Sequence, residues 1–86
     1  LRSLDLRNCG LSGAGVKVLT GFVGLAELRR LVLSGNRIGP DGVRALVGSP
    51  YLGGLRSLRL ARCQIGDHAV RGLVRAPFWP NLVELD

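Results

Sequence analysis

The chain has 86 residues, of which 47% are hydrophobic and 21% are charged, and this composition excludes an intrinsically disordered chain. Its 12 basic and six acidic residues give a formal net charge of +6. No apolar run approaches the roughly 20 residues of a membrane-spanning helix, and no basic start followed by an apolar stretch indicates a signal peptide. We therefore expect a soluble domain without a membrane segment.

Leucine recurs every 27 residues along the whole sequence. The equivalent positions include Leu1, Leu28, Leu55 and Leu82, and then Leu4, Leu31, Leu58 and Leu85. The chain thus divides into three repeats, 1–27, 28–54 and 55–81, and the start of a fourth, 82–86. Because the fourth repeat is incomplete and the sequence contains no methionine, we expect residues 1–86 to be a single array cut from a longer chain that supplies further repeats or caps.

Each repeat is expected to begin with a short strand, at residues 4–6, 31–33 and 58–60. In Leu4-Asp5-Leu6 the two leucines fall on one face and the aspartate on the other, because side chains alternate along a strand. A small or polar residue that points inward is expected after each strand, at Cys9, Asn36 and Cys63. A polar side chain there can satisfy backbone groups where the chain leaves the strand.

The next segment of each repeat is predicted to be a short helix. The N-caps of these helices are predicted at equivalent positions, at Ser12, Gly39 and Gly66. Apolar residues three apart provide the buried side of each helix, at Val16 and Leu19, Val43 and Leu46, and Val70 and Leu73. Pro50 and Pro77 are expected to end the second and third helices. A further core residue is predicted near the end of each repeat, at Leu25, Leu52 and Trp79.

The repeated form LxxLxLxx(N/C)x(I/L)GxxGVxxL, with a helix in every repeat, resembles the ribonuclease-inhibitor-like class of leucine-rich repeats. The resemblance covers the whole chain and implies an α/β fold: a right-handed solenoid with parallel strands on the concave face and helices on the convex face. The uniform 27-residue repeat differs from the alternating, longer repeats of that inhibitor, so its ligand cannot be carried over. Uniform helical repeats are also similar to arrays in large bacterial proteins.

The two cysteines, Cys9 and Cys63, are equivalent residues two repeats apart. Parallel strands lie about 4.8 Å apart, so their separation of roughly 10 Å exceeds the limit of about 7 Å for a disulfide. We expect both thiols to be reduced, buried and structural, which favours the cytoplasm. The same distance argues against a shared metal ion.

No motif indicates an enzyme or a cofactor. The glycine-rich run at residues 10–17 lacks the GxxxxGK[ST] spacing of a phosphate-binding loop, and the repeat itself explains its glycines. His68 stands beside Asp67, but no serine or cysteine nucleophile shares that position in another repeat. We expect His68 to be a solvent-facing residue of the first helical turn.

The outward residues of the strands, together with the turns that follow them, form the predicted partner-binding surface. On this concave face we select Asp5, Arg7, Arg30, Val32, Arg59, Arg62 and Glu84. Arginine pairs readily with carboxylates, so a protein partner with acidic groups fits this surface.

Nucleic-acid binding is the weaker interpretation of the basic charge, because nucleic-acid-binding modules usually combine a basic patch with exposed aromatic side chains. Here the aromatic residues fall near the ends of repeats, where we expect burial, at Phe22, Tyr51, Phe78 and Trp79.

The sequence therefore predicts a non-catalytic protein–protein interaction scaffold, with no small-molecule substrate, cofactor or metal. Two alternatives stay open beside it. The array could be an architectural spacer or the recognition arm of a larger protein, such as a ligase or a GTPase regulator. It could also bind nucleic acid weakly through its basic surface, in which case affinity would fall steeply with salt.

Overall fold

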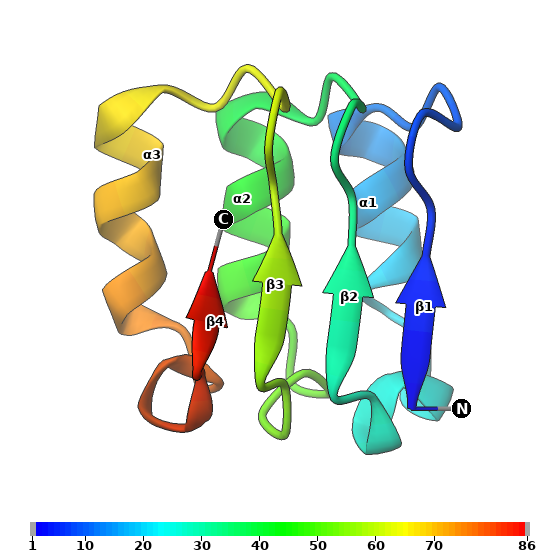
Figure 1. Ribbon diagram of the computed structural model, residues 1–86, viewed down its shortest axis with the longest axis vertical. Coiled ribbons are helices and arrows are strands. Elements are labelled where there is room, and N and C mark those ends of the chain that lie inside the picture. Colours follow the sequence, from blue (N-terminus) through cyan, green and yellow to red (C-terminus); the bar gives the residue numbers. More distant parts are fainter. Residues whose placement is uncertain (1, 86) are drawn as a thin grey trace.

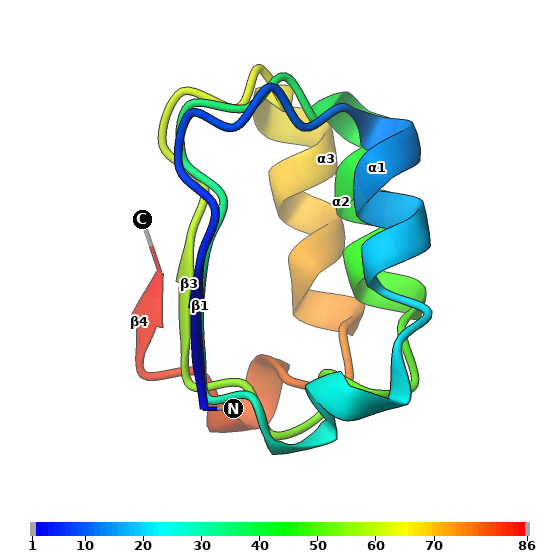
Figure 2. The same ribbon diagram turned by 90° about the vertical axis from the view of Figure 1, so that its right-hand side faces the viewer.

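In the computed structural model, which describes residues 2–85, the chain forms a parallel sheet with helices packed on one of its faces (Figures 1 and 2). Leu1 and Asp86 lie outside the described residues, so what the repeat pattern predicts for them stays a prediction. The strands are β1 (Ser3–Asp5), β2 (Arg30–Val32), β3 (Ser57–Arg59) and β4 (Glu84–Leu85). The α-helices are α1 (Gly13–Leu19), α2 (Gly39–Gly48) and α3 (Gly66–Gly72). Short 3-10 helices complete the second half of the first and third repeats, at η1 (Val23–Glu27), η2 (Leu73–Arg75) and η3 (Trp79–Asn81).

The sheet order β1-β2-β3-β4 follows the sequence, and every pair of neighbours is parallel. Leu4 pairs with Leu31, Leu31 with Leu58 and Leu58 with Leu85, a shift of one repeat each time. Each strand–helix–strand connection is right-handed, as Figure 1 shows. This arrangement confirms the repeat and the predicted α/β solenoid.

The core lies between the sheet and the helices (Figure 2) and is built from the recurring apolar positions of the repeat. Its fully buried members come from all three repeats and include Val16, Leu28, Leu31, Leu33, Ile38, Leu46, Leu52, Leu55, Leu58, Leu73 and Phe78. Full burial of one such aliphatic side chain contributes about 1.5–3 kcal/mol. None of the helices formed by residues 2–85 is long and apolar enough to cross a membrane.

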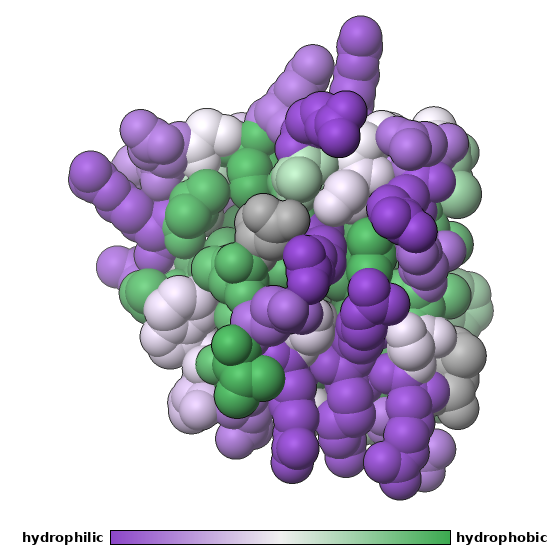
Figure 3. Space-filling view, viewed as in Figure 1, coloured by the Kyte–Doolittle hydropathy of each residue, from purple (hydrophilic) through white to green (hydrophobic). Residues whose placement is uncertain are grey.

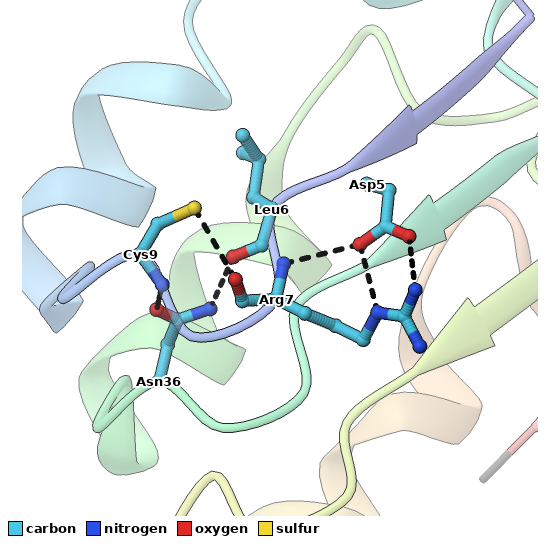
Figure 4. Close-up of polar contacts among 5 residues, drawn as sticks. All are labelled: Asp5, Leu6, Arg7, Cys9 and Asn36. Atoms are coloured by element: carbon cyan, nitrogen blue, oxygen red, sulfur yellow. Dashed lines mark hydrogen bonds and ion pairs between the residues drawn. The ribbon is translucent and has the colours of Figure 1, made fainter.

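Asn36 joins the first repeat to the second from inside the turn after β2 (Figure 4). Its side chain is 1% exposed. The amide nitrogen donates to the carbonyl oxygens of Leu6 and Leu33, at 2.8 and 2.9 Å. The amide oxygen accepts from the backbone N–H groups of Cys9 and Leu11, both at 3.0 Å. Asn36 thus satisfies four backbone groups, three of them where the first repeat leaves the sheet, as predicted.

The two cysteines at the position equivalent to Asn36 differ in burial. Cys63 is buried, and its thiol donates to the carbonyl oxygen of Leu33 at 3.1 Å; burial raises its pKa. Cys9, in contrast, is exposed. The prediction that both are buried was therefore wrong for Cys9, because among the described residues no repeat covers the outer side of the first one. Both thiols are free.

The predicted N-cap is confirmed for α1 but was wrong for α2 and α3, whose N-caps are Ile38 and Ile65. Ser12 caps α1, and its hydroxyl accepts from the N–H of Gly15 at 3.3 Å. Gly39 and Gly66 are instead the first residues of α2 and α3, with φ of 62° and 72°. A residue with a side chain adopts that left-handed conformation only at a cost. Glycine is therefore favoured at these two positions because it has no Cβ.

The end of the third repeat departs from the prediction. Leu25 and Leu52 are buried as expected, but Trp79 is 36% exposed and Phe78, at 0%, takes the core position. In this repeat α3 is followed by the 3-10 turn η2, and a 3-10 turn has about 3.0 residues rather than 3.6. The chain after it is therefore rotated, and the neighbouring residue faces the core.

Burial of the other aromatic residues is also only partly as expected. Phe22 is 59% exposed and Tyr51 is half-buried.

Candidate functional site

The solvent-facing side of the sheet carries the outward residues of the strands, and we call it the sheet face. Strand register places its members in rows that run across the strands, namely Ser3, Arg30, Ser57 and Glu84, then Asp5, Val32 and Arg59. Arg7 follows β1, and Arg62 lies in the turn after β3 with a left-handed φ of 57°. Figure 3 shows that hydrophilic side chains dominate this face over β1–β3.

Val32 does not present a contact surface, contrary to the prediction. It points outward but is only 3% exposed. It lies between Asp5 on β1 and Arg59 on β3, and the longer side chains around it exclude solvent. Val32 therefore belongs to the packing of the face rather than to its accessible part.

Asp5 and Arg7 form an ion pair at one side of the sheet face (Figure 4). Arg7 Nη2 lies 2.9 Å from Asp5 Oδ2, and Nε donates to Oδ1 at 3.2 Å. The backbone N–H of Arg7 also donates to Oδ1, at 3.1 Å. This backbone hydrogen bond, with the Arg7 guanidinium, lowers the pKa of Asp5.

A second ion pair lies across β3 and β4. Glu84 Oε1 accepts from the Ser57 hydroxyl at 2.7 Å, and Oε2 lies 2.7 Å from Arg59 Nη2. The Ser57 hydrogen bond, and then Arg59, lower the pKa of Glu84. The polar Ser57 is buried and was not among the predicted partner-binding residues. Its register opposite Glu84 is the signal that could have found it.

Arg30 occupies the middle of the face, between these two neutralised pairs. It is exposed, and its guanidinium makes no hydrogen bond or ion pair with any residue in the described range 2–85. Its positive charge contributes to the lowered pKa of both Asp5 and Glu84. Arg62 is likewise exposed. The accessible charge of the face is therefore positive.

A family model described as Leucine Rich repeat matches residues 1–19, 27–47 and 55–74. The chain belongs to the leucine-rich repeat family. Each matched segment covers one strand and all but at most one residue of the α-helix that follows it. Leucine-rich repeats generally act as protein-interaction scaffolds and are typically non-enzymatic. No curated protein matches the chain.

The convex side of this leucine-rich repeat array has a groove of about 480 Å³ between α2 and α3. Its walls are mostly apolar, with polar residues at the rim, and include Val43, Val47, Ile65, Ala69, Arg44, His68 and Arg75. His68 is exposed, as predicted, and no serine or cysteine is among the groove's described lining residues. Nowhere in residues 2–85 do three His, Cys, Asp or Glu side chains come together in a way that could hold a metal ion.

Proposed function

We propose that the chain is a non-catalytic protein–protein interaction scaffold that binds its partner through the sheet face. Four in-register strands fix the backbone positions from which the outward side chains project, so a partner has no backbone of this face to order. Family membership supports the general role, and the described surface supports this particular face.

The observation that carries the proposal is the isolated Arg30 guanidinium. Asp5 and Glu84 on either side already accept hydrogen bonds from Arg7, Ser57 and Arg59. Arg30 is therefore left to a partner's carboxylate, and its planar group can bind that carboxylate through two parallel hydrogen bonds. Arg62 extends the same charge to the turn after β3.

The test is a charge reversal at two arginines whose side chains make no hydrogen bond or ion pair within residues 2–85. We would immobilise the chain, identify the protein it retains, and measure that protein's affinity for the wild type and for the Arg30→Glu/Arg62→Glu variant. We expect a loss of at least about tenfold, equivalent to about 1.4 kcal/mol. Lys17→Glu/Arg71→Glu, on α1 and α3, is the control with the same change in net charge.

The proposal fails if the folded Arg30→Glu/Arg62→Glu variant binds the partner as tightly as the wild type. Equal losses in this variant and in the helix control would indicate attraction by net charge alone. Circular dichroism of both variants establishes that the fold is kept.

We also propose the ribonuclease-inhibitor-like subclass for this array. Its support is the presence of an α-helix in every complete repeat, at α1, α2 and α3. A solved structure of the chain with loops or strands in place of these helices would contradict it.

A further inference from the structure

The turn that follows β3 contains two left-handed residues that are not glycine. Arg62 has a φ of 57° and Gln64 has a φ of 56°. Within residues 2–85 the only other non-glycine residue with a positive φ is Asn8, and asparagine adopts this conformation more readily than most residues. The side chains of Arg62 and Gln64 are both exposed.

The equivalent residues of the other repeats show what the backbone favours at the position of Arg62. That position holds Asn8 in the first repeat and Gly35, with a φ of 77°, in the second. All three residues are left-handed, so the repeat requires this conformation here. Glycine adopts it without the steric cost that a Cβ adds, and the third repeat nevertheless carries an arginine.

Gln64 stands in the same relation to the first repeat. Its equivalent there is Gly10, with a φ of 71°, whereas Arg37 in the second repeat is not left-handed. The third repeat therefore keeps the turn of the first repeat but places a long polar side chain where the first has glycine.

Contacts with the second repeat hold the backbone on both sides of these two residues. The carbonyl oxygens of Ala61 and Cys63 accept from the N–H groups of Gly35 and Gly39, at 2.9 and 3.2 Å. Cys63, which separates the two left-handed residues, is buried, and its thiol donates to the carbonyl oxygen of Leu33 at 3.1 Å. None of these contacts uses the side chain of either left-handed residue.

Neither side chain compensates for its steric cost within the described chain. Arg62 and Gln64 make no side-chain hydrogen bond or ion pair with any residue in the range 2–85. The pKa values of Asp5 and Glu84 are lowered by other arginines and not by Arg62, so neither carboxylate of the sheet face neutralises its charge. Strained residues of this kind are concentrated at ligand-binding sites.

We propose that Arg62 and Gln64 are specificity-determining residues that bind an acidic peptide segment of the partner at the turn after β3. The Arg62 guanidinium binds a carboxylate of the segment through two parallel N–H donors. The Gln64 carboxamide both donates and accepts, so it binds a neighbouring peptide group. This inference rests on the proposed function and names the part of the partner that meets the turn.

The position of the turn suits this role. Figure 1 shows it at the end of the sheet where the strands finish, so a segment bound there continues onto the sheet face. Figure 3 shows hydrophilic side chains that project beyond this end of the molecule.

A peptide of alternating glutamate and glycine, acetylated and amidated at its ends, is the probe for this turn. It is titrated into the full ¹⁵N-labelled chain, and the side-chain N–H signals are followed by NMR. We expect the Arg62 Nε–H and Gln64 amide signals to shift and saturate together. The Arg71 Nε–H signal, from the exposed side of α3, should not move.

Glycine variants separate binding from folding. Arg62→Gly/Gln64→Gly copies Gly35 and Gly10, so we expect its urea midpoint to rise while its affinity for the peptide falls at least fivefold. Asn8→Gly makes the same kind of change in the first repeat and should alter the affinity less than twofold. Arg71→Gln, which loses the same single charge, should also alter it less than twofold.

Several results would overturn the inference. No saturable shift in the wild type, or unchanged affinity in Arg62→Gly/Gln64→Gly, would exclude binding at the turn. A lower urea midpoint of that variant would assign the two side chains to the fold, and an equal loss in Arg71→Gln would indicate attraction by net charge. Tighter binding of a single-stranded oligonucleotide at the same signals would assign the turn to nucleic acid.

The outcome for the proposed function is separate. If the peptide test fails while Arg30→Glu/Arg62→Glu still weakens binding of the partner, only this inference fails. If that variant leaves partner binding intact, the proposed function fails.

Discussion

Replacing Asn36 by alanine should remove the strongest polar link between the first two repeats. Its amide makes four hydrogen bonds to backbone groups, at 2.8 to 3.0 Å. Each is worth about 1 kcal/mol net, so their loss costs about 4 kcal/mol. The Leu33 carbonyl keeps the Cys63 thiol as a donor, which reduces the expected cost to about 3–4 kcal/mol.

That loss is large for a chain of this size, since a domain of 86 residues is stabilised by only about 4–13 kcal/mol. Urea unfolding followed by circular dichroism measures it. With an m-value of about 1 kcal/mol per molar urea, the midpoint should fall by about 3 M. Asn36→Cys, which copies Cys63 and keeps one donor, should lose about 1 kcal/mol less than Asn36→Ala.

Asn81→Ala is the matched control for Asn36→Ala. The Asn81 amide makes one exposed hydrogen bond, to the Gly53 carbonyl oxygen at 3.1 Å, so its loss should cost less than about 1 kcal/mol. The reasoning is refuted if Asn36→Ala is no more destabilising than Asn81→Ala.

Three further outcomes follow from burial and charge. Phe78→Ala should destabilise the chain by about 3–5 kcal/mol and Trp79→Ala by much less, which thermal unfolding would reveal; the reverse order would show that Trp79 is the core residue. The lowered pKa of Glu84 means that its pairing stabilises the fold above its ordinary pKa of 4.5 and that this contribution is lost as pH falls through the lowered value. Glu84→Gln should therefore flatten the acid side of the stability profile, and an unchanged profile would contradict this. A thiol reagent should label Cys9 at once but Cys63 only after unfolding, because burial and a raised pKa protect the latter; equal labelling rates in the native chain would argue against that protection.

The repeat made most of the fold predictable. Each repeat contributes one strand, and parallel strands keep their leucines on the inward face only if equivalent residues of adjacent repeats pair. The observed register does this, because it aligns Leu4, Leu31, Leu58 and Leu85 across the sheet. The inward position of Asn36 follows from its equivalent place in the repeat. The predictions that were wrong concern the exposure of side chains, which depends on the neighbouring residues rather than on the period of the repeat. Alternation along the strand gives the direction of a side chain, but its exposure depends on the length of the side chains around it.

Val32 and Trp79 illustrate that limit. Val32 points outward as predicted, yet the longer residues on β1 and β3 cover it. Phe78 and Trp79 are adjacent, and the period of the repeat does not account for the 3-10 turn η2 that precedes them. On the sheet face, register brings Ser57 opposite Glu84, but the sequence does not specify the side-chain rotamers that close their hydrogen bond.

The bonds that tie one repeat to the next share a property that affects how the array folds. They join residues 24 to 30 positions apart, and each strand pairs only with the strands of adjacent repeats. The loop of chain that must close to form a contact between adjacent repeats is therefore about one repeat long at every point of the array. If the array grows by whole repeats, its relative contact order falls, since the separations stay fixed while the chain lengthens. A longer array of this kind would fold by adding repeats to a formed neighbour, with no long-range search at any step.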